Sequence, residues 1–305
     1  MVGSSNIDLI ARVPRMPGPG ETLIGSQFQM GYGGKGANQA VMAARLGAQV
    51  AVVTKVGSDI FGRDTAANFK AQGCDTQFVL VDDELFSGVA PITVDEITGQ
   101  NSIIIVPGAN NGLSPDDVRA ASDAILGADV LICQLEIPLE TTLEAFRIAK
   151  GTQGKSVLTI LNPAPAAPLP DELLALTDIL VPNEVEASML LDNAPIEGPA
   201  QAVEAARKLR ERGPKSVIIT MGKNGAVLLE DGKEARSFPA QVVQAVDSTG
   251  AGDSFVGSLA YFLAAGRSMD DAVQRAIQIA TRSVLKHGTQ TSYPHRDEVL
   301  DILGE

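Results

Sequence analysis

Short apolar runs rich in β-branched residues alternate with segments of helical apolar spacing over most of the chain, and this alternation constrains the fold most strongly. Strands buried on both faces have this continuous apolar character, and a helix between two such strands joins them in parallel. We therefore predict an α/β fold, a three-layer α/β/α sandwich with a mostly parallel central sheet. The expected strands lie within the ranges 51–57, 129–136, 156–165, 178–184 and 216–222.

Three stretches interrupt this alternation and predict a second, smaller sheet. Residues 7–13, 22–34 and 87–108 have the pattern of short strands, and residues 96–100, within the last of these stretches, are typical of a hairpin turn. We expect these strands to be antiparallel and to form a lid inserted into a single domain that spans residues 1–305.

The net charge of −13, from 37 acidic and 24 basic residues, limits the partners of the chain. An acidic surface repels phosphate backbones and anionic lipids, so we expect neither nucleic acid nor a membrane as a partner. The apolar runs end well short of the roughly 18–20 residues that a membrane span needs. The first residues lack the basic and apolar regions of a secretory signal, and we therefore expect a cytoplasmic protein.

The chain has only two cysteines and two histidines, which limits the kinds of catalytic or metal site it can form. Cys74 and Cys133 are far apart in the sequence and lie among apolar or small residues, which is typical of buried, reduced thiols. His287 and His295 have no cysteine or carboxylate at ligand spacing. The sequence therefore points away from a zinc site or a histidine-based triad, and toward carboxylates, lysine, amides and the backbone.

Polar side chains follow the expected parallel strands where each strand ends. In an open parallel sheet the carboxyl ends of the strands meet at one edge, where ligands bind. Four consecutive strands ending in polar groups predict a binding site at this edge. These groups are Gln134, Glu136, Asn162, Asn183, Glu186, Thr220 and Gly222.

The strongest motif runs from Asp247 to Phe255 and reads DSTGAGDSF. A Gly-Ala-Gly turn that opens a helix exposes backbone amides, and the helix dipole adds positive potential there. Such a turn suits the charge that develops on a transferred phosphoryl group, with Asp253 in the first helical turn as a proton acceptor. The alternative is an ordinary glycine-rich turn before an acidic helix start.

A second glycine-rich motif, GYGGKGANQA, covers residues 31–40 and leads into a helix of small residues. It lacks the spacing of a Walker phosphate loop. Its glycines would let the backbone approach a ligand, with Lys35 and Asn38 as donors; a plain strand-to-helix turn is the alternative. Near the start, Asn6 and Asp8 share one face of a strand, where they could bind neighbouring hydroxyls or form a solvated edge.

These motifs together resemble the ribokinase (phosphofructokinase-B) family of sugar kinases over nearly the whole chain. The resemblance includes GGKGAN (33–38) and DSTGAGD (247–253). Further matching segments, in the order of the family, are GSSNID (3–8), GAN (108–110), QLE (134–136), NPAPA (162–166), PNEVE (182–186) and GTQTSYP (288–294).

The resemblance implies phosphorylation of ribose by ATP with Asp253 as the general base. The amides of Gly250, Ala251, Gly252 and Asp253 would form an anion hole. The sugar would be bound under the lid by Asn6, Asp8, Gly34, Lys35, Asn38 and Glu136. The family also implies a homodimer joined through the lids.

The resemblance further implies two metal cofactors besides ATP. Asn183 and Glu186 would place phosphate and Mg²⁺ largely through water. Contacts to the nucleotide would come from Thr220, Gly222, Lys223, Gly225 and Gly252. A monovalent activator, K⁺, would be enclosed mostly by backbone carbonyls of Asp247, Thr249, Ser283, Lys286, Gly288 and Ser292.

Several alternatives stay open at the level of sequence. The substrate could be another pentose, deoxyribose or a nucleoside, or the chain could be a non-catalytic sugar-binding relative. A nicotinamide-dependent dehydrogenase is a remote alternative, because no Gly-x-Gly-x-x-Gly motif follows the first strand. Only Met1 and Val2 precede Gly3, fewer apolar residues than the family usually has. This predicts either a shortened start or a central sheet that begins with a very short strand.

Overall fold

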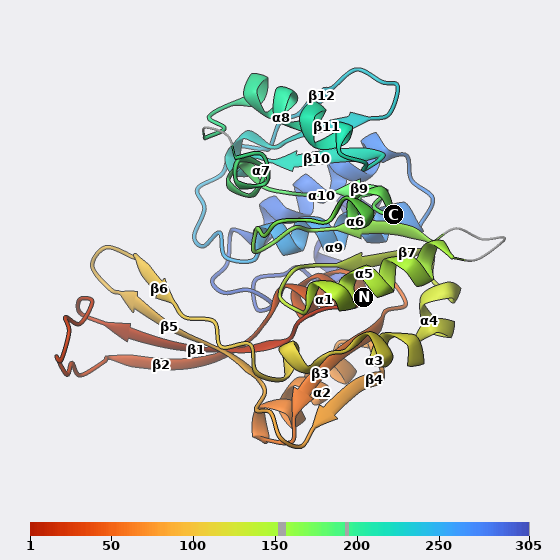
Figure 1. Ribbon diagram of the computed structural model, residues 1–305. Helices are drawn as coiled ribbons and strands as arrows, with labels where there is room; N and C mark the ends of the chain where they lie inside the picture. The colour runs from red at the N-terminus through yellow and green to blue at the C-terminus, as the bar shows by residue number, and fades with distance from the viewer. Residues whose placement is uncertain (152–156, 193–194, 305) are drawn as a thin grey trace.

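A mixed sheet forms the centre of the computed structural model, which describes residues 1–151, 157–192 and 195–304 (Figure 1). Six strands lie in the order β12-β11-β10-β9-β8-β7, and β7 to β10 are mutually parallel. Their bounds are β7 Val130–Cys133, β8 Leu158–Leu161, β9 Ile179–Leu180, β10 Ser216–Thr220, β11 Ala226–Glu230 and β12 Arg236–Phe238. Ser156, where the expected 156–165 strand would start, lies outside the described residues.

The first three residues, Met1–Gly3, connect this sheet to a pair of parallel strands, β3 (Ala51–Gly57) and β4 (Asp75–Asp82). The amide of Val2 donates to the carbonyl of Ile132 in β7, and the amide of Gly3 donates to that of Val53 in β3, both at 3.1 Å. The central sheet therefore continues through Met1–Gly3, as expected for a sheet that begins with a very short strand.

Helices cover both faces of the sheet because successive strand residues point to opposite sides. In β10, Val217 and Ile219 pack into one core and Ile218 into the other. The first core is completed by helices α3 (Pro115–Ala120), α4 (Ser122–Gly127), α5 (Leu139–Lys150), α6 (Asp171–Ala175), α7 (Glu184–Leu190) and α8 (Pro199–Glu211). The second is completed by α1 (Lys35–Leu46), α9 (Ala251–Ala264), α10 (Met269–Ser283) and α11 (Leu300–Leu303).

The lid is a four-stranded sheet that projects from one side of the central layers (Figure 1). Its order is β2-β1-β5-β6, with β1 Asn6–Val13, β2 Gln27–Gly33, β5 Gly88–Asp95 and β6 Asn101–Ile103. The expectation that all lid strands are antiparallel is wrong for β1 and β5, which pair in parallel. The chain leaves the lid after β2 and returns through α1, β3, α2 (Ile60–Ala71) and β4, so it enters β5 in the direction of β1.

The remaining short elements are 3₁₀ turns: η1 (Gly108–Gly112), η2 (Gly222–Asn224) and η3 (Arg296–Glu298). Cys74 and Cys133 are buried free thiols, as predicted, and burial raises the pKa of Cys133 to about 12. Among the described residues, no helix combines the length and apolar character needed to cross a membrane.

Candidate functional site

Asp253 lies in the first turn of α9, where the helix faces the amino-terminal half of α1. Its side chain is 7% exposed. Both carboxylate oxygens accept hydrogen bonds from amides of α1: Oδ2 from Asn38 Nδ2 at 3.0 Å and Oδ1 from Gln39 Nε2 at 2.9 Å. The two glycine-rich motifs, more than 200 positions apart, therefore meet at one carboxylate.

Glycines in the motif of residues 31–40 allow α1 to begin directly against β1. Gly34 has a φ of +86°, and a Cβ there would lie 2.7 Å from the backbone nitrogen of Asn6. A Cβ on Gly36 would lie 2.7 Å from the nitrogen of Ser4. Because backbone atoms cannot move aside as flexible side-chain ends can, larger residues would push the start of α1 away from β1 and from Asp253.

The turn before Asp253 presents backbone amides, as the sequence motif predicts. Gly250 has a φ of +76° and its carbonyl accepts from the hydroxyl of Tyr293 at 2.9 Å. The amide of Ala251 donates to Ser248 at 3.2 Å. In the described part of the chain, the amides of Gly250, Gly252 and Asp253 have no such acceptor, so these three can receive an anion at the positive end of α9.

Asn6 and Glu136, two of the residues expected to bind the sugar, are held by hydrogen bonds. The side-chain oxygen of Asn6 accepts from Asn110 Nδ2 at 2.8 Å, which leaves the Asn6 amide nitrogen for a ligand. Glu136 accepts through Oε2 from the Ser4 hydroxyl at 2.6 Å and from the Lys35 amide at 2.9 Å. Its Oε1 has no such partner in the described residues and can accept from a hydroxyl.

Acidic side chains crowd this site and perturb one another. Burial, together with the charges of Glu136 and Asp253, raises the pKa of Asp8 from 3.8 to about 7. Burial also raises the pKa of Glu186 above its usual range, and the charge of Asp253 adds to the effect. Burial alone would lower the pKa of Lys35, but the surrounding carboxylates outweigh it and raise that pKa. Lys35 is thus the cation at the centre of an acidic cluster.

The expected nucleotide side lies at the ends of β9 and β10. Asn183 and Glu186 form a capping box at the start of α7: the Glu186 amide donates to Asn183 Oδ1 at 2.8 Å and the Asn183 amide donates to Glu186 Oε2 at 2.9 Å. Asn183 also forms a β-bridge with Thr220. Beyond it, Gly222 and Gly225 have positive φ values around the short η2 turn, which also contains the exposed Lys223.

The two loops expected to hold a monovalent cation are joined by Asp247. Its Oδ1 accepts from the amide of Thr249 at 2.9 Å and its Oδ2 from the amide of Gly288 at 2.9 Å. Although burial opposes it, these hydrogen bonds lower the pKa of Asp247. The side chains of the other candidates point elsewhere: Lys286 pairs with Glu298 at 2.7 Å, and the hydroxyls of Ser283 and Ser292 donate to nearby carbonyls.

Sequence reasoning missed the roles of Gln39, Gln134 and Gln290. Gln134, which follows a strand expected to end at the binding edge, is fully buried and donates to Gln39 Oε1 at 2.6 Å. Gln39 also donates to Asn162 Oδ1 at 3.0 Å, so two expected strand ends are connected through α1. The only signal was position, since Gln39 and Gln290 lie inside recognised motifs without an assigned function.

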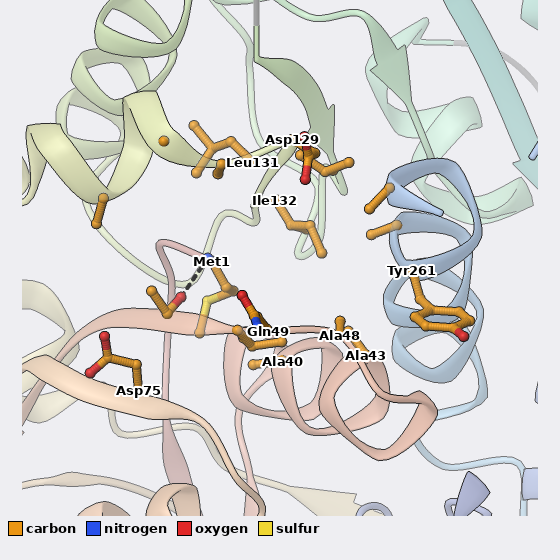
Figure 2. A pocket seen from close by; sticks show the side chains of 18 of the residues that line it. Met1, Ala40, Ala43, Ala48, Gln49, Asp75, Asp129, Leu131, Ile132 and Tyr261 are labelled. Atoms are coloured by element: carbon orange, nitrogen blue, oxygen red, sulfur yellow. Dashed lines mark hydrogen bonds between the residues drawn. The ribbon is translucent and has the colours of Figure 1, made fainter. Parts of the chain in front are cut away.

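A cavity of about 830 Å³ lies at the opposite ends of the strands, away from every predicted site residue. Figure 2 shows Met1, Ala40, Ala43, Ile132 and Tyr261 around it. Its walls come from the amino ends of β3 and β7 and from α1 and α9, and most of its lining is small or apolar. Ligand sites in such sheets lie at the carboxyl ends of the strands, so the polar cluster around Asp253 is a better candidate than this cavity.

Comparison with known proteins identifies a family and several relatives. A family model described as pfkB family carbohydrate kinase matches residues 1–296. The chain is 43% identical over 303 residues to ribokinase of Mus musculus, covering 98% of this chain and 92% of that one. It is 40% identical over 304 residues to deoxyribokinase of Salmonella typhi, with coverage of 99% and 97%. The structure of Arabidopsis thaliana ribokinase complexed with ribose and ATP superimposes with a TM-score of 0.89 at 32% identity, covering 100% and 97%.

Proposed function

Since the chain belongs to the pfkB family of carbohydrate kinases, we propose that it transfers the γ-phosphoryl group of ATP to the 5-hydroxyl of ribose. The observation that carries this proposal is the position of Asp253. Its buried carboxylate is held by two amides directly after a turn with free backbone amides. Transfer to a hydroxyl requires a proton acceptor next to an anion site, and Asp253 with this turn provides both.

In the proposed reaction Asp253 accepts the proton of the 5-hydroxyl as that oxygen bonds to the γ-phosphorus. The bond from the γ-phosphorus to the bridging oxygen breaks, and ADP leaves with the electron pair. Phosphoryl transfer passes through a loose transition state, so positioning and charge neutralisation do most of the work. The amides of Gly250, Gly252 and Asp253 would stabilise the charge on the transferred group.

The sugar would lie between β1 and the start of α1. Asp8, Glu136 and the free amide nitrogen of Asn6 offer acceptors and a donor for neighbouring hydroxyls, and Lys35 and Asn38 approach from α1. A pocket built to hydrogen-bond a hydroxyl rejects the analogue that lacks it, because its buried polar groups lose a partner. We therefore favour ribose over 2-deoxyribose, although curated relatives include deoxyribokinases.

Mg²⁺ would arrive with ATP. No cluster of three or more acidic, histidine or cysteine side chains suited to a metal ion occurs among the described residues. Mg²⁺ usually keeps several waters and takes the rest of its ligands from one or two carboxylates and the substrate phosphates. Glu186 fits this role, because one of its oxygens caps α7 and the other remains available. The ion would neutralise charge on the phosphates.

K⁺ would lie between the loops that Asp247 joins. Carbonyl-rich cages suit large monovalent ions, and the side chains of Lys286, Ser283 and Ser292 point to other partners, which leaves only their backbone for this purpose. Because Asp247 lies three residues before Gly250, a cation here would set the geometry of the anion turn without touching a substrate.

A homodimer would cover the apolar side of the lid. Phe28 and Met30, on one face of β2, are 65% and 52% exposed, and Ile103 of β6 is also exposed. Exposed apolar strands are a liability in a monomer, since they pair with other chains. A second copy would bury both lids at once by two-fold symmetry.

The decisive test of the reaction is Asp253→Asn, which keeps the shape and removes the proton acceptor. We expect kcat to fall by about 10²–10⁴-fold with ribose binding, measured by calorimetry, largely retained. A variant within threefold of wild type would remove Asp253 as the base. An ADP-release panel with ribose, 2-deoxyribose, hexoses and nucleosides tests the substrate, and a higher kcat/KM for 2-deoxyribose would overturn the choice of ribose.

A further inference from the structure

Two chains of side-chain amides converge on the carboxylate of Asp253. In the first, Asn68 Nδ2 donates to Gln290 Oε1 at 2.9 Å, and Gln290 Nε2 donates to Asn38 Oδ1 at 3.2 Å. Asn38 Nδ2 then donates to Asp253 Oδ2 at 3.0 Å. In the second, Gln134 donates to Gln39, and Gln39 donates to Asp253 Oδ1 at 2.9 Å.

Asn38, Gln39 and Gln290 each accept from the residue behind them and donate toward Asp253. Asn68 and Gln134 begin the two chains as donors. A turned amide at position 38 would place its oxygen against a carboxylate oxygen, where two acceptors repel. The donor from Gln290 prevents this turn, because it fixes which end of the Asn38 amide is the oxygen. Hydrogen bonds aligned in this way also polarise one another and strengthen the last bond of the chain.

We infer that Gln290 is a positioning residue for Asp253, acting through Asn38 to keep the carboxylate in a single, fully hydrogen-bonded orientation. Gln290 is 4% exposed and its backbone carbonyl accepts from Arg45 at 2.7 Å, so its backbone is held in place. It comes from the loop whose Tyr293 also holds Gly250. This loop therefore supports both the base and the anion turn. The inference rests on the proposed role of Asp253 as the base.

Several charged or titratable groups surround Asp253, and none of them is altered by a substitution at Gln290. Lys35 of α1, Asp8 of β1, Glu186 of α7 and Tyr293 of the carboxyl-terminal loop interact with Asp253 electrostatically. Glu136, which follows β7, acts on Asp8 and Lys35. Gln290 itself is neutral, so its effect comes from the direction of a hydrogen bond.

Gln290→Glu tests the direction of the chain. An ionised glutamate can still accept from Asn68 but can no longer donate to Asn38, so the Asn38 amide is free to turn its oxygen toward Asp253. We expect kcat at pH 8 to fall by about 10- to 100-fold, the scale of a misplaced catalytic group, with KM for ATP within twofold. As the pH falls toward 5.5 the glutamate takes up a proton and donates again, so the ratio of variant to wild-type kcat should rise.

Two further variants separate positioning from packing. Gln290→Met cannot donate at any pH, so its loss of kcat should be similar across the same range. Gln72→Glu is the matched control: Gln72 accepts from Arg45 Nε at 2.9 Å beside these residues but is outside both chains, and kcat should stay within twofold of wild type. If Gln290→Glu does not fold, Asn68→Asp interrupts the same chain one residue further out and should show a smaller loss with the same pH trend.

The inference is overturned if Gln290→Glu keeps kcat within twofold of wild type at pH 8. It is also overturned if the loss is the same at every pH or is shared by Gln72→Glu, since either result would indicate general damage to packing. Measuring Asp253→Asn in parallel separates the role of Asp253 as the base from the positioning role of Gln290. An active Asp253→Asn refutes the proposed base, whereas an inactive Asp253→Asn with an unaffected Gln290→Glu refutes only the positioning role.

Discussion

Replacing Asp8 by Asn should make the folded protein more stable at alkaline pH. Asp8 is 8% exposed, and burial together with the charges of Glu136 and Asp253 raises its pKa from 3.8 to about 7. One pKa unit corresponds to about 1.4 kcal/mol, so an ionised Asp8 costs the native state up to about 4 kcal/mol above pH 7. An amide has almost the same shape and carries no charge to desolvate.

The sign of the pH dependence follows from the direction of this shift. Below pH 3.8 the carboxyl is protonated in both the folded and the unfolded chain and costs nothing. As the pH rises toward 7, the unfolded chain releases its proton while the folded protein retains it, so wild-type stability falls progressively. The advantage of Asp8→Asn should therefore grow by about 2.5 kcal/mol between pH 5 and pH 8.5.

Urea unfolding of both proteins at several pH values provides the measurement. The amide introduced by Asp8→Asn also changes hydrogen bonds, but this changes the difference in unfolding free energy between the two proteins by the same amount at every pH. The change of that difference with pH is therefore the quantity that tests the prediction. Asp178→Asn is a control with a different pH window: although burial opposes it, hydrogen bonds from Lys150 and Lys215 lower the pKa of Asp178, so the difference between this variant and wild type should stay constant from pH 5 to pH 8.5 and shrink only at more acidic pH. A difference between wild type and Asp8→Asn that stays constant within 0.5 kcal/mol, about the error of such additive comparisons, would refute the reasoning.

Three further predictions concern the turn, the cation and the lid. Gly34→Ala should destabilise by at least about 2 kcal/mol more than Gly20→Ala in thermal or urea unfolding, because both glycines have positive φ but only position 34 also meets backbone atoms; equal losses would contradict this. Wild-type kcat should be higher in potassium chloride than in tetramethylammonium chloride at matched ionic strength, and Asp247→Ala should lose this difference; equal wild-type rates would exclude the cation site. Phe28→Asp should convert a dimer of the 31.8 kDa chain into a monomer by light scattering, with kcat/KM for ATP measured as a control, and a monomeric wild type would remove the dimer proposal.

The layered fold could be predicted from sequence because its signal is local. A continuous apolar run such as residues 216–220 can be buried on both faces only within a covered sheet, and β10 is found there. The direction of the lid strands could not be predicted in this way. Strand pairing depends on the path of the chain between strands, and the long connection from β2 to β5 makes β5 parallel to β1.

In the candidate site, too, some residues have a local sequence signal and others do not. Asp253 and the glycines are recognisable because a helix start with exposed amides requires those residue types. Gln39 and Gln290 carry no such signal, since an amide donates or accepts equally well in any polar setting. Their function depends on partners from β7, β8, α1 and α2, which only the folded chain brings together.

The candidate site contains more carboxylates than basic side chains. Glu136, Glu186 and Asp253 interact with a single lysine, Lys35, and ATP would bring additional negative charge next to them. Like charges at this spacing repel, so the amides of the anion turn and Lys35 cannot by themselves balance the triphosphate. A divalent cation on the phosphates relieves this repulsion and leaves Asp253 free to accept a proton. We therefore expect the proposed reaction to require Mg²⁺, although the described residues form no metal site of their own.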